Sequence, residues 1–187
     1  MISERAKFGC YSLLSRCLED SLRSAAVPTW TMVPLNNDKE ISHRQFIMLT
    51  ISSYDFRMVL LLHFFRSAPS MKYVADMLRI SPEALESSRF DDYLAEVGNV
   101  FCGAFKRELA NFFPHLGMST PNLLLSESLQ YIKTWPVEYE THVRAHDGGQ
   151  LAFCGSLYVT SAGELDFNPQ ELSRRVEEVQ TGALEMF

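Results

Sequence analysis

Apolar side chains recur at helical spacing through the first part of the chain. Within residues 3–25 they occupy every third or fourth position, and this spacing predicts a helix. The apolar positions are Phe8, Tyr11, Leu14, Leu18 and Leu22. Pro28 and Pro34 follow and end the helix, and we expect a turn-rich segment at 34–38.

Two neighbouring apolar segments predict a β-hairpin. Residues 40–51 begin with alternation and end apolar, and residues 56–65 form a continuous apolar run after the turn sequence SSYD. Runs of this length, bounded by turn residues, are typical of paired antiparallel strands. Pro69 then opens a short helix, which we expect at 70–79.

A second long helix is expected at about 90–113. Ser81 precedes it as a typical N-cap, and Pro82 occupies the first helical position of that start. Pro114 and Gly117 follow the apolar pattern, so the helix is expected to stop there.

A second hairpin is predicted towards the C-terminus. It follows a loop that contains Pro121 and a short strand at 122–125. Residues 135–145 alternate between polar and apolar positions, which favours a strand. The sequence HDGG at 146–149 is a typical hairpin turn, and residues 151–160 are expected to form the return strand.

The order of a helix followed by a hairpin therefore occurs twice. Residues 3–25 precede the hairpin at 40–65, and residues 90–113 precede the hairpin at 136–160. This rhythm predicts a pseudo-symmetric α+β fold, in which two long helices pack on an antiparallel sheet built from two hairpins. An additional polar helix is expected at 169–186, because Asn-Pro-Gln-Glu begins it as a capping sequence.

The composition is that of a globular protein. Of 187 residues, 47% are hydrophobic and 21% are charged, so residues 1–187 are interpreted as one domain with a substantial core. A formal net charge of −6 argues against nucleic acid and against anionic membrane as partners. The charged N-terminus is unlike a signal peptide, and the longest apolar run, at 58–65, is too short to span a bilayer. We therefore expect a cytoplasmic protein.

Cysteine and histidine residues offer weaker candidates for chemistry. The four cysteines form no C-x-x-C pair, and we interpret them as buried free thiols. His142 and His146 share one face of a predicted strand, and with Cys154 on the return strand they outline a metal site. No fourth ligand has a fixed spacing to them, so this interpretation is disfavoured. His63, inside an apolar run, is interpreted as a core or edge histidine.

The helix at about 90–113 carries a polar stripe. At 100° per residue, one arc of roughly 100° contains Asp92, Glu96, Asn99, Gly103, Lys106, Arg107 and Ala110. The opposite side is predicted to contain Tyr93, Leu94, Val97, Val100, Phe101, Ala104 and Phe112. A glycine inside a helix costs about 1 kcal/mol relative to alanine. One physical reason to keep Gly103 on an exposed face is close approach by another molecule.

The stripe resembles the motif of a known family. The CheC/CheX/FliY phosphatases of bacterial chemotaxis carry Asp or Ser, then Glu four residues later, Asn three residues after the Glu, and Pro about twenty-two residues after the Asn. This chain has Asp92, Glu96, Asn99 and Pro121 at those spacings. The family helix also tends to have a glycine four residues after the asparagine, where this chain has Gly103.

The resemblance extends beyond the motif. The order of helices and hairpins over residues 3–165 is similar to that of the family fold. The first long helix lacks a second Glu-x-x-Asn pair, so the chain resembles the single-site, CheX-like arrangement. It departs from the family in two places: residues 54–65 lack the small and glycine residues usual at the start of the first hairpin's return strand, and the helix at 169–186 is an addition.

The resemblance implies a protein phosphatase that hydrolyses the aspartyl phosphate of a CheY-type response regulator. Asn99 would hold the attacking water, and Glu96 would pair with a lysine of the partner. The residues implied to bind the partner are Asp92, Gly103, Lys106 and Pro121. No cofactor or metal is expected on this chain, because the resemblance implies that Mg²⁺ belongs to the response regulator.

Two other interpretations remain open. The same fold serves in non-catalytic adaptors that bind response regulators and in flagellar-switch-like modules, and a fold alone does not fix an activity. An interaction domain with an accidental motif match is the third interpretation. A homodimer is also open, because an exposed edge strand of either hairpin can pair with a second copy.

Overall fold

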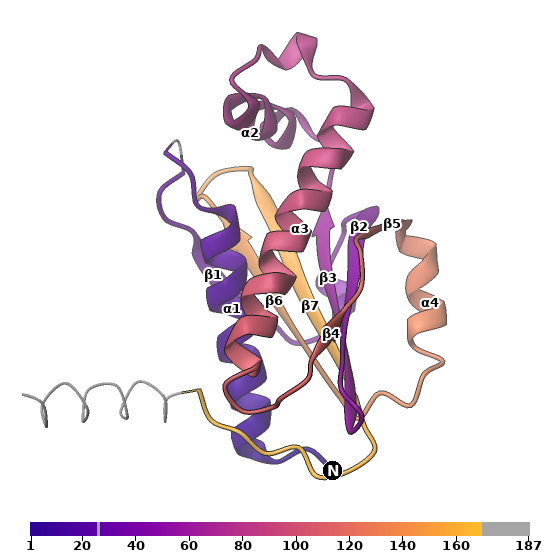
Figure 1. Cartoon of the computed structure of the whole chain (residues 1–187). Coiled ribbons are helices and arrows are strands. Elements are labelled where there is room, and N and C mark those ends of the chain that lie inside the picture. Colours follow the sequence, from indigo (N-terminus) through magenta and orange to yellow (C-terminus); the bar gives the residue numbers. More distant parts are fainter. Residues whose placement is uncertain (26, 170–187) are drawn as a thin grey trace, which may run out of the picture.

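Seven strands form one antiparallel sheet in the part of the chain that the computed structural model describes, residues 1–25 and 27–169 (Figure 1). Their order is β1-β6-β7-β3-β2, and β4 and β5 both pair with the outer edge of β2. The strands are β1 (Thr31–Leu35), β2 (Gln45–Ser52), β3 (Phe56–Phe64), β4 (Gly117–Met118), β5 (Asn122–Leu125), β6 (Tyr139–His146) and β7 (Ala152–Ser161).

The two predicted hairpins form the middle of this sheet. In the first, β2 pairs with β3 and places Ile47 opposite Leu62. In the second, β6 pairs with β7 and places Val143 opposite Gly155. β3 and β7 then pair with each other, which joins the two hairpins. The predicted α+β fold, with an antiparallel sheet built on two hairpins, is confirmed.

Two long helices lie side by side on one face of the sheet (Figure 1). α1 (Glu4–Leu22) packs over β6 and β7, and α3 (Ser87–Leu109) packs over β2. Ser3 caps α1, because its Oγ accepts a hydrogen bond from the N–H of Ala6 at 3.0 Å. The shorter helical elements are α2 (Ala68–Leu78), α4 (Leu129–Ile132) and the 3₁₀ turns η1 (Asp38–Glu40), η2 (Pro82–Ala84) and η3 (Ser126–Ser128).

The main core lies between these two helices and the sheet. Buried side chains from both layers fill it, among them Leu14, Leu18, Phe101, Phe105, Leu60 and Leu157. Gly98 lets α3 approach β2 closely, because a Cβ at this position would lie 2.9 Å from Cγ2 of Ile47. This packing fixes which side of α3 faces the sheet and therefore which side faces outward.

The opposite face of the sheet carries a second, smaller core, which we call the outer core. Its buried members are Phe46, Val59, Leu61, Ile132 and Tyr158. Ile132 belongs to α4, and Trp135 in the segment after α4 packs half-buried against the same group. The outer core was not predicted, because a four-residue helix is too short to reveal a hydrophobic period.

The first strand was also missed. The turn-rich segment expected from residue 34 overlaps β1, where Pro34 lies opposite Val143. β1 is an edge strand of the sheet. Proline is tolerated at such an edge, because its missing N–H can face away from the neighbouring strand. The prediction treated Pro34 as a terminator, and this was wrong.

Some predicted boundaries were also wrong. Ser81 opens only the 3₁₀ turn η2 and makes no side-chain cap, so α3 begins at Ser87 and ends at Leu109. β2 begins at Gln45 rather than at residue 40, because residues 38–40 form η1 instead. The helix predicted at 169–186 lies, from residue 170 onward, outside the described residues.

Candidate functional site

The N-terminal part of α3 is held in place by an ion pair. Arg66, which follows β3, donates from Nη2 to Oδ1 of Asp91 at 2.5 Å. The guanidinium of Arg66 also lies 5.1 Å from the centre of the Phe90 ring, which is buried in the main core. Asp91 is therefore occupied by a structural contact. Its neighbour Asp92 is exposed and remains available to a partner.

The predicted polar stripe lies on the outward side of α3. Asp92 and Glu96 are exposed, and Asn99 and Gly103 are partly exposed at the border with the packed side. Among the described residues, no hydrogen bond or ion pair engages the side chain of Asp92, Glu96 or Asn99. The stripe thus presents two carboxylates and an amide without intramolecular partners, one helical turn apart.

The charges of the stripe change sign along the helix. The acidic residues Asp92 and Glu96 lie in its N-terminal half, and Lys106 and Arg107 lie in its last turn. Glu108 is turned towards α1, where Oε2 lies 3.0 Å from Nη2 of Arg16. Asn99 therefore sits between an acidic end and a basic end of one exposed surface.

The two glycines of α3 have opposite surroundings. A Cβ on Gly98 would meet Ile47 at 2.9 Å and Leu49 at 3.3 Å, so packing against β2 explains this glycine. A Cβ on Gly103 would meet nothing within 4 Å. Packing within the described chain therefore gives no reason for Gly103, although a helical glycine costs about 1 kcal/mol relative to alanine.

Val100 belongs to the stripe, and its placement on the apolar side was wrong. The structure leaves 51% of Val100 exposed. Four residues after Glu96, it is rotated by about 40° from that residue, which the helical period already implied. The stripe therefore includes an apolar contact between Glu96 and Gly103 that the sequence prediction missed.

Pro121 comes to this region from the sheet rather than from α3. It is half-buried and directly precedes β5. β5 pairs with β2 and places Leu123 opposite Ile47, the residue against which Gly98 packs. The loop that contains Pro121 therefore lies at the sheet edge beside the middle of α3, and α3 contacts both β4 and β5.

Two histidines of the sheet, His63 and His142, form a buried group with Ser156 on its outer face. Nε2 of His63 and Nδ1 of His142 each lie 2.9 Å from Oγ of Ser156, and all three residues are buried. Burial lowers the pKa of His63 to about 3, and burial also lowers the pKa of His142. The core location interpreted for His63 is confirmed, but its Nδ1 is buried without a hydrogen-bond partner among the described residues, so the expectation of a satisfied histidine holds for Nε2 alone.

The metal site outlined by His142, His146 and Cys154 is not assembled. Within residues 1–25 and 27–169, no group of three or more His, Cys, Asp or Glu side chains is placed to hold a metal ion. All four cysteines are buried free thiols, as predicted. Burial raises the pKa of Cys10, Cys17 and Cys102 to about 12, so these thiols stay protonated at neutral pH.

No helix in the described part of the chain combines the length and the apolar character that crossing a membrane requires. No family model matches the sequence, and neither does any curated protein.

Two helices on one face of this sheet define an α+β fold that solved structures share. It is the CheC/CheX-like fold of bacterial chemotaxis proteins. The chemotaxis protein CheX of Vibrio vulnificus superposes with a TM-score of 0.61 at 16% identity, over 79% of this chain and 97% of that chain. A CheC-like superfamily protein of Shewanella sp. PV-4 gives 0.59 at 11% identity, over 80% and 96%.

A third similar structure contains a partner. It is the complex of CheX with CheY, BeF₃ and Mg²⁺ from Borrelia burgdorferi. Its TM-score is 0.61 at 13% identity, over 80% of this chain and 94% of that chain. At these identities the likeness establishes the fold, and it confirms the fold that the motif resemblance implied.

Proposed function

We propose that this chain is a cytoplasmic protein phosphatase that hydrolyses the aspartyl phosphate of a CheY-type response regulator. One observation carries the proposal: Glu96 and Asn99 lie without intramolecular partners on an exposed helix face, next to a glycine with open space above it. The fold supports it, because a structure of the same fold was solved as a complex of CheX with CheY.

Asn99 would place the attacking water. An amide side chain both donates and accepts hydrogen bonds, so it can fix a water molecule in one orientation. The transition state of phosphoryl transfer is loose, and positioning in line with the breaking bond therefore matters more than a strong base. The water oxygen bonds to phosphorus while the bond from phosphorus to the aspartyl oxygen breaks. The aspartate leaves as a carboxylate, and the water protons remain on the inorganic phosphate.

Glu96 would orient the complex. Its carboxylate is exposed and unpaired, so it can form a charge-assisted hydrogen bond with a lysine of the partner. Gly103 would leave room for the partner's backbone, with Asp92, Val100 and Lys106 as contacts along the same stripe. Pro121 would fix the loop at the sheet edge beside this surface. We assign the Mg²⁺ ion to the response regulator.

Binding without hydrolysis is the alternative function. The exposed Val100 is consistent with it, since an apolar contact in the middle of the stripe contributes to docking, which both functions require. An adaptor would use the same surface and would not depend on the amide of Asn99.

Phosphate loss from receiver proteins separates the two functions. CheY-type receivers loaded with labelled phosphate are followed with this protein and with its Asn99→Ala and Glu96→Gln variants. We expect the wild type to accelerate the loss, Asn99→Ala to lower the rate by at least about a hundredfold, and Glu96→Gln to weaken binding. Asn111→Ala is the matched control, because Asn111 is exposed beyond the helix end and bonds only to carbonyls of its own chain.

Acceleration that survives Asn99→Ala would exclude the proposed mechanism. Binding of the receiver without acceleration by the wild type would support the adaptor. Absence of binding to every receiver tested, in a protein whose unfolding is cooperative, would exclude both functions.

A further inference from the structure

The proposed function leaves unused a cleft on the opposite face of the sheet. Side chains of a strand alternate between the two faces. Leu60 of β3 belongs to the main core on the helix side, while its neighbours Val59 and Leu61 belong to the outer core. Arg57 lies two residues before Val59 on the same strand, so its side chain projects from the same outer face, away from α3.

Arg57 stands in the middle of a polar row. The register places it opposite Ser52 of β2 on one side and opposite Thr160 of β7 on the other. Opposed residues on antiparallel strands have Cβ atoms about 4.5–5.5 Å apart. A guanidinium is thus flanked by two hydroxyls on one surface. Within the described residues, none of these three side chains makes a hydrogen bond or ion pair.

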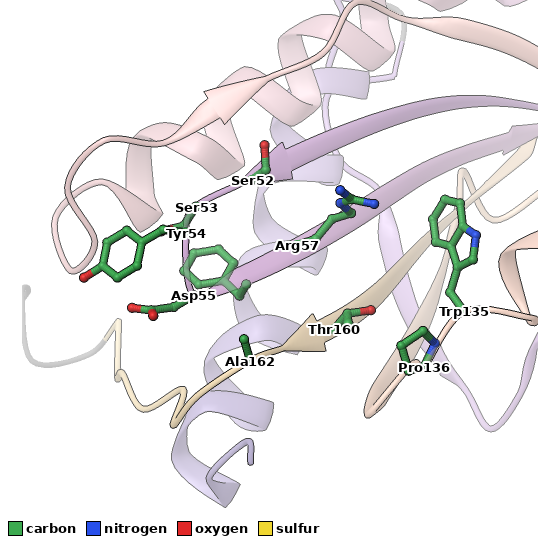
Figure 2. Close-up of a pocket in the computed structure, with 10 residues that line it drawn as sticks. Ser52, Ser53, Tyr54, Asp55, Arg57, Trp135, Pro136, Thr160 and Ala162 are labelled. Atoms are coloured by element: carbon green, nitrogen blue, oxygen red, sulfur yellow. The ribbon is translucent and has the colours of Figure 1, made fainter.

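The row forms the floor of a cleft, which is walled by Trp135 and Pro136 (Figure 2). The cleft encloses about 370 Å³. A second hollow of about 350 Å³ shares Ser52, Arg57 and Trp135 with it and is bounded by β4. Volumes of this size, with one aromatic wall and a few polar groups, are those of small-molecule sites.

The acidic residues near the cleft do not neutralise Arg57. Asp55 lies at its rim, and Figure 2 shows its carboxylate directed away from the guanidinium. Glu138 is engaged elsewhere: its Oε2 lies 3.4 Å from the N-terminal ammonium of Met1, and its Oε1 accepts from the N–H of Ser161 at 3.2 Å. The positive charge of Arg57 therefore faces the cleft without a counter-charge from the described residues.

We propose that this cleft binds a small organic anion that carries a carboxylate or phosphate group attached to a flat apolar part. The guanidinium of Arg57 presents several N–H donors that match two oxygens of such a group. The hydroxyls of Ser52 and Thr160 add donors on either side. The indole of Trp135 offers a flat apolar surface to the rest of the ligand. The site lies on the face opposite the stripe of α3, so it does not depend on the proposed phosphatase activity.

Binding can be followed at the wall of the cleft itself. The chain has two tryptophans, so a ¹H–¹⁵N spectrum of the intact protein contains two indole N–H signals. Trp30 is buried and donates from Nε1 to the carbonyl of Leu22 at 3.1 Å, and its signal serves as a reference for the fold. A Trp135→Phe variant assigns the other signal. The probes are phenyl phosphate and benzoate, with neutral benzyl alcohol as the control.

We expect the Trp135 signal to shift with at least one of the two anions and not with benzyl alcohol. Arg57→Gln should lower the affinity at least tenfold, because a hydrogen bond to a charged group is worth about 1.5–3 kcal/mol. Arg44→Gln is the matched control, since Arg44 is exposed just before the other end of β2. A shift equal with benzyl alcohol, no shift with either anion at about 10 mM, or a smaller loss in Arg57→Gln with the Trp30 signal unchanged, would each overturn the proposal.

Discussion

The two glycines of α3 should respond in opposite ways to the same substitution. Gly103→Ala adds a methyl group where nothing lies within 4 Å, so only the intrinsic helix propensity changes. That term favours alanine by about 1 kcal/mol. Gly98→Ala gains the same propensity, but its methyl group would lie 2.9 Å from Cγ2 of Ile47, which is buried under the helix. Overpacking of this kind costs about 1–3 kcal/mol.

The net changes in stability expected for the two alanine variants have opposite signs. Gly103→Ala should raise the free energy of unfolding by up to about 1 kcal/mol. Gly98→Ala should lower it by about 0–2 kcal/mol after the propensity gain is subtracted. Urea titrations measure both, provided that the slope with denaturant stays constant. For a chain of this length, 1 kcal/mol corresponds to a shift of about 2–4 °C in Tm.

A larger side chain at position 103 tests whether a partner approaches this glycine closely. Gly103→Leu keeps good helix propensity and should not destabilise the fold, yet it fills the space that the partner would need. We expect it to weaken receiver binding and dephosphorylation by at least about tenfold. If Gly103→Ala and Gly98→Ala change stability equally, the packing argument is refuted. If Gly103→Leu is stable and fully active, close approach is not the reason for this glycine.

Two further predictions concern the packing around the site and the sheet. Arg66→Met should lower the free energy of unfolding by about 1–2 kcal/mol, because it removes a partly buried ion pair with Asp91 and the contact over Phe90. The control Lys72→Met breaks an exposed ion pair within α2 and should lower it by at most about 0.5 kcal/mol. Equal losses of the two variants in urea titrations would contradict this prediction. Burial lowers the pKa of His63 from 6.5 to about 3, so between these values the unfolded chain binds a proton that the folded chain does not. The contribution of neutral His63 to stability should therefore be fully present above about pH 6.5 and be lost towards pH 3. His63→Leu should lose less stability than the wild type between pH 7 and pH 5. An unchanged pH dependence in this variant would show that other groups account for the loss of stability in acid.

The fold was predictable where local pattern and tertiary packing agree. The hairpin of β2 and β3 follows from two apolar runs around a short turn, and α1 and α3 follow from helical periods. β1 was missed because its pairing with β6 is decided by the distant strand rather than by its own proline-containing sequence. The N-cap assigned to Ser81 was wrong for a related reason, since Ser81 has the residue type of an N-cap but opens only the 3₁₀ turn η2 and makes no side-chain cap.

The two candidate sites differ in how far the sequence reveals them. The stripe of α3 lies on one helix, so a rotation of 100° per residue places Glu96 and Asn99 together, and the same arithmetic applies to Val100. The cleft joins Ser52, Arg57 and Thr160 from three strands, and only their register sets them side by side. The spacing of these residues along the sequence does not specify the register, because the register depends on which strands pair with each other. An unpaired arginine in the chain therefore indicates nothing by itself, whereas the same arginine between two hydroxyls, in a cleft that Trp135 also lines, gives a physical reason for the proposed anion site.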